Sequence, residues 1–403
     1  MTRERLQRAG TYLDVPASIL DVPETIPQLG YGSHQFFRYY GKFPSVVGAA
    51  IVGAHATRGE AVLDCYAGSG TTLVEAQNAG HPSFGLDLNP LAVLASRVKT
   101  AYVDAAAARA ALSRVYKLAA ELLCDAPRLP RSMSPARLDK WFTPSARGEL
   151  AALRDALLAE PEGLTRDFLL TAYLGVVRRV STAYDGEVRP HVNPRKRPRS
   201  PFVAFKRKAV EMIERLADIA ALRSWGVPSA CHLGDNREPE QYRQLLSDVE
   251  PSLVVAHPPY LNSFNYLAVF SLEFAWAEDF AELFEGTDLG TLRLAEHLAH
   301  PATNSALVTR YYDDFRRTIV AASAAASPCA RIAVVIGDAT IRGEVEPVHA
   351  RAWQIMQRIG LKPIEVWFRT THYGIGKYAY KHRADYHGDE TEKKDAILFF
   401  EKA

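Results

Sequence analysis

The pattern in residues 61–90 limits most strongly how this chain can fold. An apolar run at 61–65 leads into the glycine turn Gly68-Ser69-Gly70, and a segment of helical character follows at 71–79. A second apolar run spans 83–88. Strand, turn, helix and strand at this spacing predict a βαβ unit. Glycines at the carboxyl end of a strand let backbone N–H groups approach a ligand closely.

Further segments extend this unit into a larger α/β fold. Strands are expected at 230–233, 253–256 and 331–336, with a closing antiparallel pair at 364–368 and 396–400. Helices are expected at 46–56, 103–123, 145–159, 165–180 and 202–221, where apolar residues recur at helical spacing. Residues 1–33 read as a polar, proline-containing lead-in. We therefore expect a Rossmann-like, mostly parallel sheet with a helical insertion.

Composition narrows the class of protein. The net charge of +2 means that any contact with nucleic acid must come from a local basic patch. The four cysteines form no C-x-x-C pair, which argues against a zinc site and a disulfide framework, and no metal is expected. No apolar run has the length of a membrane span, and no signal-type stretch follows the N-terminus. A soluble cytoplasmic protein is the expectation.

A stiff corner follows the strand expected at 253–256. Its sequence is His257-Pro258-Pro259-Tyr260. The two prolines fix φ twice and remove two N–H donors, so their carbonyls and the following aromatic ring are held in place. This corner suits a flat ring, whereas the glycine turn suits a nucleotide-like cofactor. Asp87, at the end of the second strand, can accept hydrogen bonds from ribose hydroxyls.

Taken together, Asp64–Thr72 and His257–Tyr260 resemble the two motifs of the amino-group DNA methyltransferases that use S-adenosylmethionine. The cofactor motif of that family resembles D-x-F-x-G-S-G-T-T, and its catalytic motif is Ser, Asn or Asp followed by Pro-Pro and an aromatic residue. The likeness covers roughly residues 30–100 and 230–403. The insertion lies before the Gly234-Asp235 segment, which is not where the best-known arrangements carry a target-recognition domain.

The resemblance implies a cofactor and its binding residues. His34–Phe43 resembles the segment that completes the methionine pocket, and Gly234–Arg237 resembles the strand end whose acid contacts adenine. S-adenosylmethionine is then expected to contact Phe43, Asp64, Tyr66, Gly68, Gly70, Thr71, Asp87, Asn89, Asp235 and His257. The implied organisation is an N-terminal segment with the cofactor-binding half at 1–100, the helical insertion at 101–225 and the catalytic half at 226–403.

The catalytic motif departs from the family at its first position. The residues expected to carry the chemistry are His257, Pro258, Pro259 and Tyr260. In the family, the first side chain and the first proline carbonyl accept hydrogen bonds from the target amine, which orients its lone pair. A neutral imidazole offers one acceptor and can take this role, whereas an imidazolium cannot. Tyr260 is expected to stack on a base flipped out of the duplex.

Two basic stretches are candidates for the DNA contact. The first has no acid between residues 188 and 208 and carries Arg189, Arg195, Lys196, Arg197 and Arg199. The second, at 377–383, carries Lys377, Lys381 and Arg383. Prolines keep the first stretch extended, and Arg and Lys can meet phosphates. Double-stranded DNA is the expected partner, and a restriction endonuclease is a possible second one.

The target atom remains open between several alternatives. Cytosine N4 comes first, because Leu261-Asn262 after the motif resembles the cytosine branch of the family. Adenine N6 follows, and then an exocyclic amine of RNA. A non-catalytic nucleic-acid-binding module is the alternative from another class, since His257 replaces the usual residue. The recognition sequence and the oligomeric state are not specified by the sequence.

Overall fold

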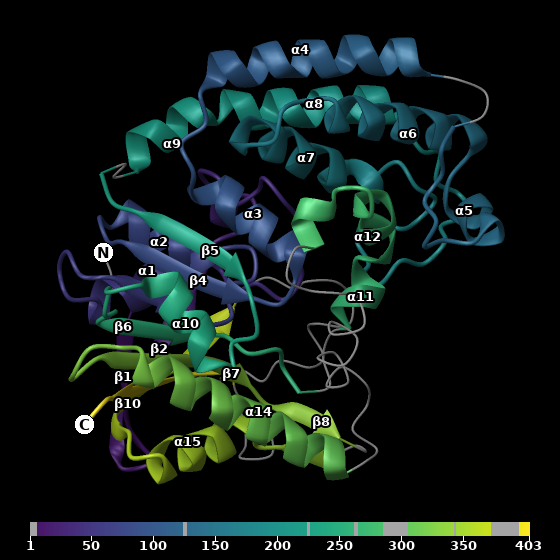
Figure 1. The fold of residues 1–403 in the computed structure, drawn as a ribbon. Coiled ribbons are helices and arrows are strands. Elements are labelled where there is room, and N and C mark those ends of the chain that lie inside the picture. Colours follow the sequence, from purple (N-terminus) through teal and green to yellow (C-terminus); the bar gives the residue numbers. More distant parts are fainter. Residues whose placement is uncertain are drawn as a thin grey trace.

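A nine-stranded sheet forms the centre of the computed structural model, which describes residues 6–123, 127–223, 226–261, 265–284, 305–341, 344–371 and 395–403 (Figure 1). The strands are β1 (Leu6–Tyr12), β2 (Val15–Val22), β3 (Val62–Asp64), β4 (Ser83–Asp87), β5 (Ser229–Leu233), β6 (Leu253–Ala256), β7 (Arg331–Gly337), β10 (Lys362–Thr371) and β11 (Asp395–Glu401). Their order across the sheet is β1-β2-β10-β11-β7-β6-β3-β4-β5. A separate antiparallel pair is formed by β8 (Ala339–Ile341) and β9 (Glu344–Glu346).

The strand order confirms the predicted fold class. Strands β5, β4, β3, β6 and β7 are parallel to one another, and β11 runs antiparallel between β7 and β10. Without the N-terminal hairpin, the seven strands follow the Rossmann-like order of class I methyltransferases. The chain leaves β3 towards β4 and later returns to β6 on the other side of β3. Ligands of open α/β sheets bind at such a switch point, beyond the carboxyl ends of the strands.

The N-terminal residues are not a lead-in, and that prediction is wrong. β1 and β2 form an antiparallel hairpin, and β2 extends the sheet by pairing in parallel with β10. The turn residues Leu13 and Asp14 both have positive φ, 51° and 64°. Two left-handed residues give a turn whose twist matches a hairpin, but Asn-Gly or Asp-Gly is the usual sequence for it. The hairpin was not predicted because Leu-Asp is not a usual sequence for such a turn.

Helices cover both faces of the sheet (Figure 1). The helices on one face are α1 (Ser45–His55), α2 (Thr71–Asn78) and α3 (Pro90–Thr100). Those on the other face are α10 (Pro239–Leu246), α14 (Ser305–Ala324) and α15 (Val348–Arg358). Two short helices, α11 (Tyr266–Val269) and α12 (Ser271–Ala277), follow the proline corner. Short 3-10 turns lie at Gln28–Gly30 and Ala281–Phe284.

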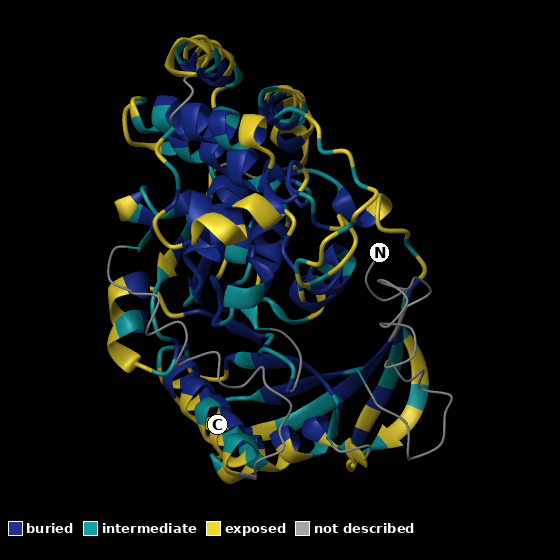
Figure 2. Cartoon of the chain, turned by 90° about the vertical axis from the view of Figure 1, so that its right-hand side faces the viewer, coloured by how far each residue is buried: buried dark blue, intermediate teal, exposed yellow. Residues whose placement is uncertain are grey.

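Residues 105–222 form a helical layer above α3 (Figure 1). Its helices are α4 (Ala105–Leu122), α5 (Pro135–Trp141), α6 (Pro144–Leu158), α7 (Leu164–Val177), α8 (Pro201–Glu214) and α9 (Leu216–Leu222). The four expected helices are confirmed, except that the one expected at 202–221 is divided at Arg215 and α5 was missed. The interior of this layer is buried (Figure 2), and one apolar cluster runs from it through α3 to α12. Among the described residues, no helix is long and apolar enough to cross a membrane.

Candidate active site

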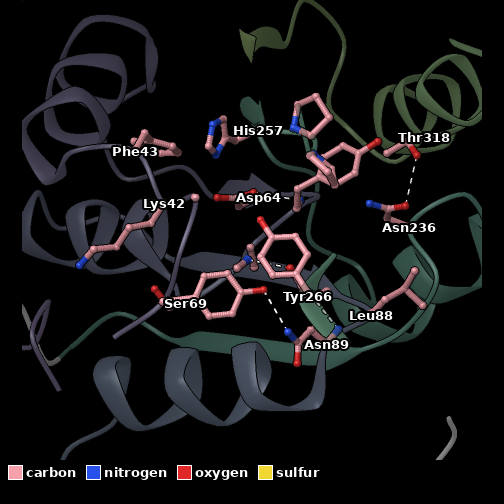
Figure 3. A pocket seen from close by; sticks show the side chains of 18 of the residues that line it. Lys42, Phe43, Asp64, Ser69, Leu88, Asn89, Asn236, His257, Tyr266 and Thr318 are labelled. Carbon is pink, nitrogen blue, oxygen red and sulfur yellow. Dashed lines mark hydrogen bonds between the residues drawn. The ribbon is translucent and has the colours of Figure 1, made fainter. Parts of the chain in front are cut away.

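A cavity of about 160 Å³ lies beyond the carboxyl ends of β3, β4 and β6 (Figure 3). It is where the sheet topology places a ligand. The predicted residues that line it are Phe43, Asp64, Tyr66, Gly68, Thr71, Asp87, Asn89, His257, Pro258 and Pro259. Three predicted residues, Gly70, Asp235 and Tyr260, do not belong to the lining. The structure therefore brings the two sequence motifs to one cavity, although they are nearly two hundred residues apart.

Two glycines shape the turn between β3 and α2. Gly68 and Gly70 have φ of 50° and 77°, a region that favours glycine. The Gly68 N–H donates to Asp87 Oδ2 at 2.8 Å, which ties the turn to the next strand. A Cβ on Gly70 would lie 2.7 Å from Ser96 Oγ. The absence of a side chain at Gly70 therefore allows α3 to pack closely against the turn. Its role is in the backbone and not in the lining.

Two carboxyl groups face the cavity, that of Asp64 buried and that of Asp87 half-buried. Burial raises the pKa of Asp64 to about 7 and the pKa of Asp87 to about 6. Backbone N–H groups of Tyr66 and Asn89 donate to these carboxylates at 3.0 and 2.8 Å. Removal from water disfavours the charged form of an acid, and a nearby cation favours it. The floor of the cavity is therefore suited to a ligand that carries hydroxyl donors or positive charge.

In the segment Gly234–Arg237, the residues that line the cavity differ from Asp235, the residue expected from the sequence. Burial disfavours ionisation of Asp235, but hydrogen bonds from Arg237 outweigh it and lower the pKa of Asp235. Arg237 Nη2 lies 2.5 Å from Asp235 Oδ2, and its Nη1 lies 2.9 Å from Asp314 Oδ1. Asn236 and Arg237 line the cavity instead of Asp235. Asp235 thus holds Arg237 at the wall.

The proline corner places His257 at the cavity and Tyr260 beside it. The His257 ring meets Phe43 and Tyr260 edge to face, with centroid distances of 5.1 and 5.4 Å. Tyr260 donates its hydroxyl to Asp395 Oδ1 at 2.5 Å, and Arg369 binds the other oxygen of Asp395. A Cβ on Gly337 would lie 2.5 Å from the Tyr260 ring. Strands β7, β10 and β11 therefore fix Tyr260.

Tyr39, in the N-terminal aromatic segment, and Tyr266, after the proline corner, form one wall of the cavity. Tyr39 stacks on Tyr266 with a centroid distance of 5.5 Å and an interplanar angle of 16°. Asn89 donates to the Tyr39 hydroxyl at 3.2 Å and caps α3 with its side-chain oxygen. Both tyrosines line the cavity. Tyr39 lies within His34–Phe43, the segment that the resemblance already placed at the methionine pocket.

The two ends of the cavity differ in chemistry (Figure 3). Lys42 and Ser69 lie at one end, while Leu88, Asn236 and Thr318 lie at the other. Burial lowers the pKa of Lys42 to about 8, and its ammonium donates to the His34 carbonyl at 3.0 Å. Ser69 Oγ is buried and has no hydrogen-bond partner in the described structure. One end thus carries an unpaired hydroxyl, and the other offers an apolar and amide surface.

Helix α14 closes the cavity on the side opposite the glycine turn, and it was missed. Its lining residues are Tyr311, Asp314, Phe315 and Thr318. Thr318 donates to Asn236 Oδ1 at 3.2 Å, which joins α14 to the strand end after β5. Segment 305–324 has apolar residues at helical spacing, a signal that would have found the helix but not its place at the cavity.

The first basic stretch lies on the surface near this site. Arg189, Arg195, Arg197 and Arg199 are exposed, in a segment between α7 and α8. The segment is not extended throughout, because Ala183 pairs with Val192 and a turn follows at Asn193. Lys196 differs, because its ammonium donates to the carbonyls of Arg178 and Ala183 and to Asp185. The predicted contacts Lys377, Lys381 and Arg383 lie outside the described residues. Within the described ranges, no group of three His, Cys, Asp or Glu residues could hold a metal ion.

Comparisons with known proteins give remote similarities only. No protein-family model matches the chain, and no curated sequence does. An rRNA methyltransferase, aviRa from Streptomyces viridochromogenes, is 12% identical over 94% of each chain with a TM-score of 0.37. A TehB-like SAM-dependent methyltransferase from Corynebacterium glutamicum is 11% identical over 88% of this chain and 87% of its own, with a TM-score of 0.31. TrmN from Thermus thermophilus is 11% identical over 90% of this chain and 49% of its own, with a TM-score of 0.30. Similarities this low assign no substrate.

Proposed function

We propose that this protein transfers a methyl group from S-adenosylmethionine to the exocyclic amine of a base in DNA, with cytosine N4 as the first candidate. One observation carries the proposal. A single cavity at the switch point of the sheet joins the acidic strand ends and glycine turn to the His-Pro-Pro corner. A cofactor and the planar amine of a base would therefore share this cavity.

The lining residues fit the proposed cofactor. Asp87 would accept hydrogen bonds from the ribose hydroxyls, and the carboxylate of Asp64 would favour a positive charge near it. The unpaired Oγ of Ser69 would meet the carboxylate of the methionine part. Leu88 and Asn236 would receive the adenine at the opposite end. When bound, S-adenosylmethionine supplies an electrophilic methyl group on a sulfonium.

His257 and the backbone after it would orient the target amine. The lone pair of an exocyclic amine is delocalised into the ring, which makes the amine a poor nucleophile. An acceptor on the imidazole and the carbonyl of Pro258 would each bind one N–H and turn the lone pair towards the methyl donor. The Phe43 and Tyr260 rings fix the imidazole from two sides. The ring of Pro258 fixes its φ angle, which helps to hold its carbonyl in place.

The exposed arginines from Arg189 to Arg199 support a nucleic acid as the carrier of the base. Just before this segment, the Glu187 carbonyl accepts a hydrogen bond from the Tyr40 hydroxyl. Tyr40 lies three residues before Phe43, which lines the cavity. A phosphate backbone held there would lie near the cavity mouth. Adenine N6 in DNA and a base amine in RNA are the alternatives within the same chemistry. A non-catalytic binding protein is the alternative if His257 cannot act.

Mass spectrometry of nucleosides tests the reaction. DNA and RNA from cells that express the protein would be digested to nucleosides and compared with material from cells that express His257→Ala. N4-methylcytosine in the DNA of the first culture alone is the expected result. N6-methyladenine or a methylated RNA nucleoside would move the target to an alternative. The absence of any methylated nucleoside, together with binding of nucleic acid, would identify a non-catalytic module.

A further inference from the structure

Arg178 joins three segments that are distant in sequence. The residue follows α7, is 5% exposed, and spreads its guanidinium over acceptors from each segment. Its Nη1 donates to the Tyr40 hydroxyl and the Val188 carbonyl, both at 2.8 Å, and to the Glu187 carbonyl at 3.1 Å. Its Nη2 donates to the carbonyl of Val269. The Arg178 node is defined as these five residues.

Each partner in the node adjoins a functional part of the molecule. Glu187 and Val188 come directly before Arg189, the first arginine of the exposed basic segment. Tyr40 follows Tyr39, which lines the cavity and stacks on Tyr266. Val269 ends the short helix α11 that Tyr266 begins. The node therefore connects the basic segment to the two stacked tyrosines of the cavity wall.

The chemistry of the node requires an arginine. A guanidinium has five N–H donors in a planar fork and can serve several carbonyls at once. The buried Glu273 carboxylate lies 3.4 Å from Arg178 Nε, which balances the buried charge. Tyr40 also donates its own hydroxyl to the Glu187 carbonyl at 2.9 Å. A lysine would keep the charge but lose the fork.

We propose that Arg178 is a positioning residue through which nucleic acid bound at the basic segment and cofactor bound in the cavity strengthen each other. This inference rests on the proposed function. Phosphates that fix the basic segment would fix the carbonyls of Glu187 and Val188, and through Arg178 they would hold Tyr40 and Val269. The cavity wall would then be ordered before the cofactor arrives. Coupling of this kind is reciprocal and typically reaches about 5- to 150-fold in affinity.

Titration calorimetry with S-adenosylhomocysteine, alone and with saturating mixed-sequence duplex DNA, tests the coupling. In the wild-type protein the Kd for this product should fall at least about fivefold when DNA is present. Arg178→Lys should bring the ratio of the two Kd values close to one, and Tyr40→Phe should lower it to an intermediate value. Both variants should bind S-adenosylhomocysteine without DNA within about twofold of the wild type, which a general loss of structure would not allow.

Tyr173→Phe is the matched control. Tyr173 also donates its hydroxyl to a buried backbone carbonyl, that of Leu150, but this bond lies inside the helical layer. The control should keep the wild-type ratio. A ratio of one in the wild type, an unchanged ratio in Tyr40→Phe, or an equal fall in Tyr173→Phe would overturn the proposal. If the wild type binds S-adenosylhomocysteine neither alone nor with DNA, the proposed function itself fails, and that result is distinct from binding without coupling.

Discussion

His257 is the residue on which the proposed chemistry depends most directly. It lies at the cavity between Phe43 and Tyr260, where the related motif carries another hydrogen-bond acceptor. His257→Ala should reduce methyl transfer by at least about a hundredfold while cofactor and DNA binding persist, the pattern of a group that acts mainly in the transition state. His257→Ser should retain part of the activity. Full activity in His257→Ala would show that the reaction needs no side-chain acceptor at this corner, and it would refute the proposed role of His257.

Activity should also fall on the acid side of neutrality. Protonation of an imidazole removes its acceptor, so the wild-type rate should decrease as pH falls. Single-turnover rates at saturating cofactor and DNA would measure this dependence. His257→Ser has no imidazole to protonate, and its profile should be flatter at the same pH values. An identical profile in both proteins would show that another group controls the rate.

The two carboxyl groups that line the cavity predict how cofactor binding depends on pH. The pKa of Asp64 is raised to about 7 and that of Asp87 to about 6, so both groups are ionised above neutrality and protonated near pH 5. The sulfonium of S-adenosylmethionine should therefore bind about tenfold more weakly near pH 5 than near pH 8. S-adenosylhomocysteine has no sulfonium charge and should show a smaller change. Calorimetry on both ligands and on Asp64→Asn measures the difference; equal profiles would show that Asp64 does not sense the charge.

At the scale of elements, the basic segment between α7 and α8 should be the main phosphate contact. Arg195, Arg197 and Arg199 are exposed, whereas Lys196 is tied to carbonyls inside the fold. Replacing the three arginines with alanine should weaken DNA binding and reduce the slope of log K against log salt by about 0.9 for each lost contact. Cofactor affinity without DNA should stay the same.

Lys196→Ala provides the contrast within the same segment. Because its ammonium already has three acceptors, its loss should lower the melting temperature and leave the salt slope within error. Fluorescence anisotropy over a salt series gives the slopes, and differential scanning calorimetry gives the melting temperature. If the triple arginine variant kept the wild-type slope, the segment would be only a solvated surface.

Elements with strong local patterns were predictable, and those defined by distant partners were not. The unit from β3 to β4 and helices α4, α6 and α7 follow apolar periodicity and glycine placement, which act over a few residues. Hairpin β1–β2 was hidden because its turn is Leu-Asp, and because β2 is stabilised by β10, more than three hundred residues away. The helix expected at 202–221 is broken at Arg215, whose guanidinium donates to the Gly30 carbonyl.

The cavity residues at the strand ends were easier to predict from the sequence than those contributed by distant helices. Asp64, Gly68 and Asp87 follow from the sheet topology, since the ends of parallel strands meet at one edge. The stacking of Tyr260 on the target base stays a prediction, and its hydroxyl donates to Asp395, 135 residues later in the chain. Helix α14 comes to the cavity only through tertiary packing. A linear pattern does not specify such contacts.

The same packing predicts that the helical layer and the sheet unfold together. One apolar cluster extends from α4 and α6 through α3 to α12, so separating the layer would expose a large buried surface. Thermal unfolding followed by circular dichroism and by tryptophan fluorescence should give coincident single transitions. Saturating S-adenosylhomocysteine at about a hundred times its Kd should add about 2.7 kcal/mol to the whole protein. Amide exchange should then slow in α7 as well as in β7, because both belong to one cooperative unit. Two separate transitions, with ligand protection confined to the strands, would instead show that the layer is an independent domain that merely rests on α3.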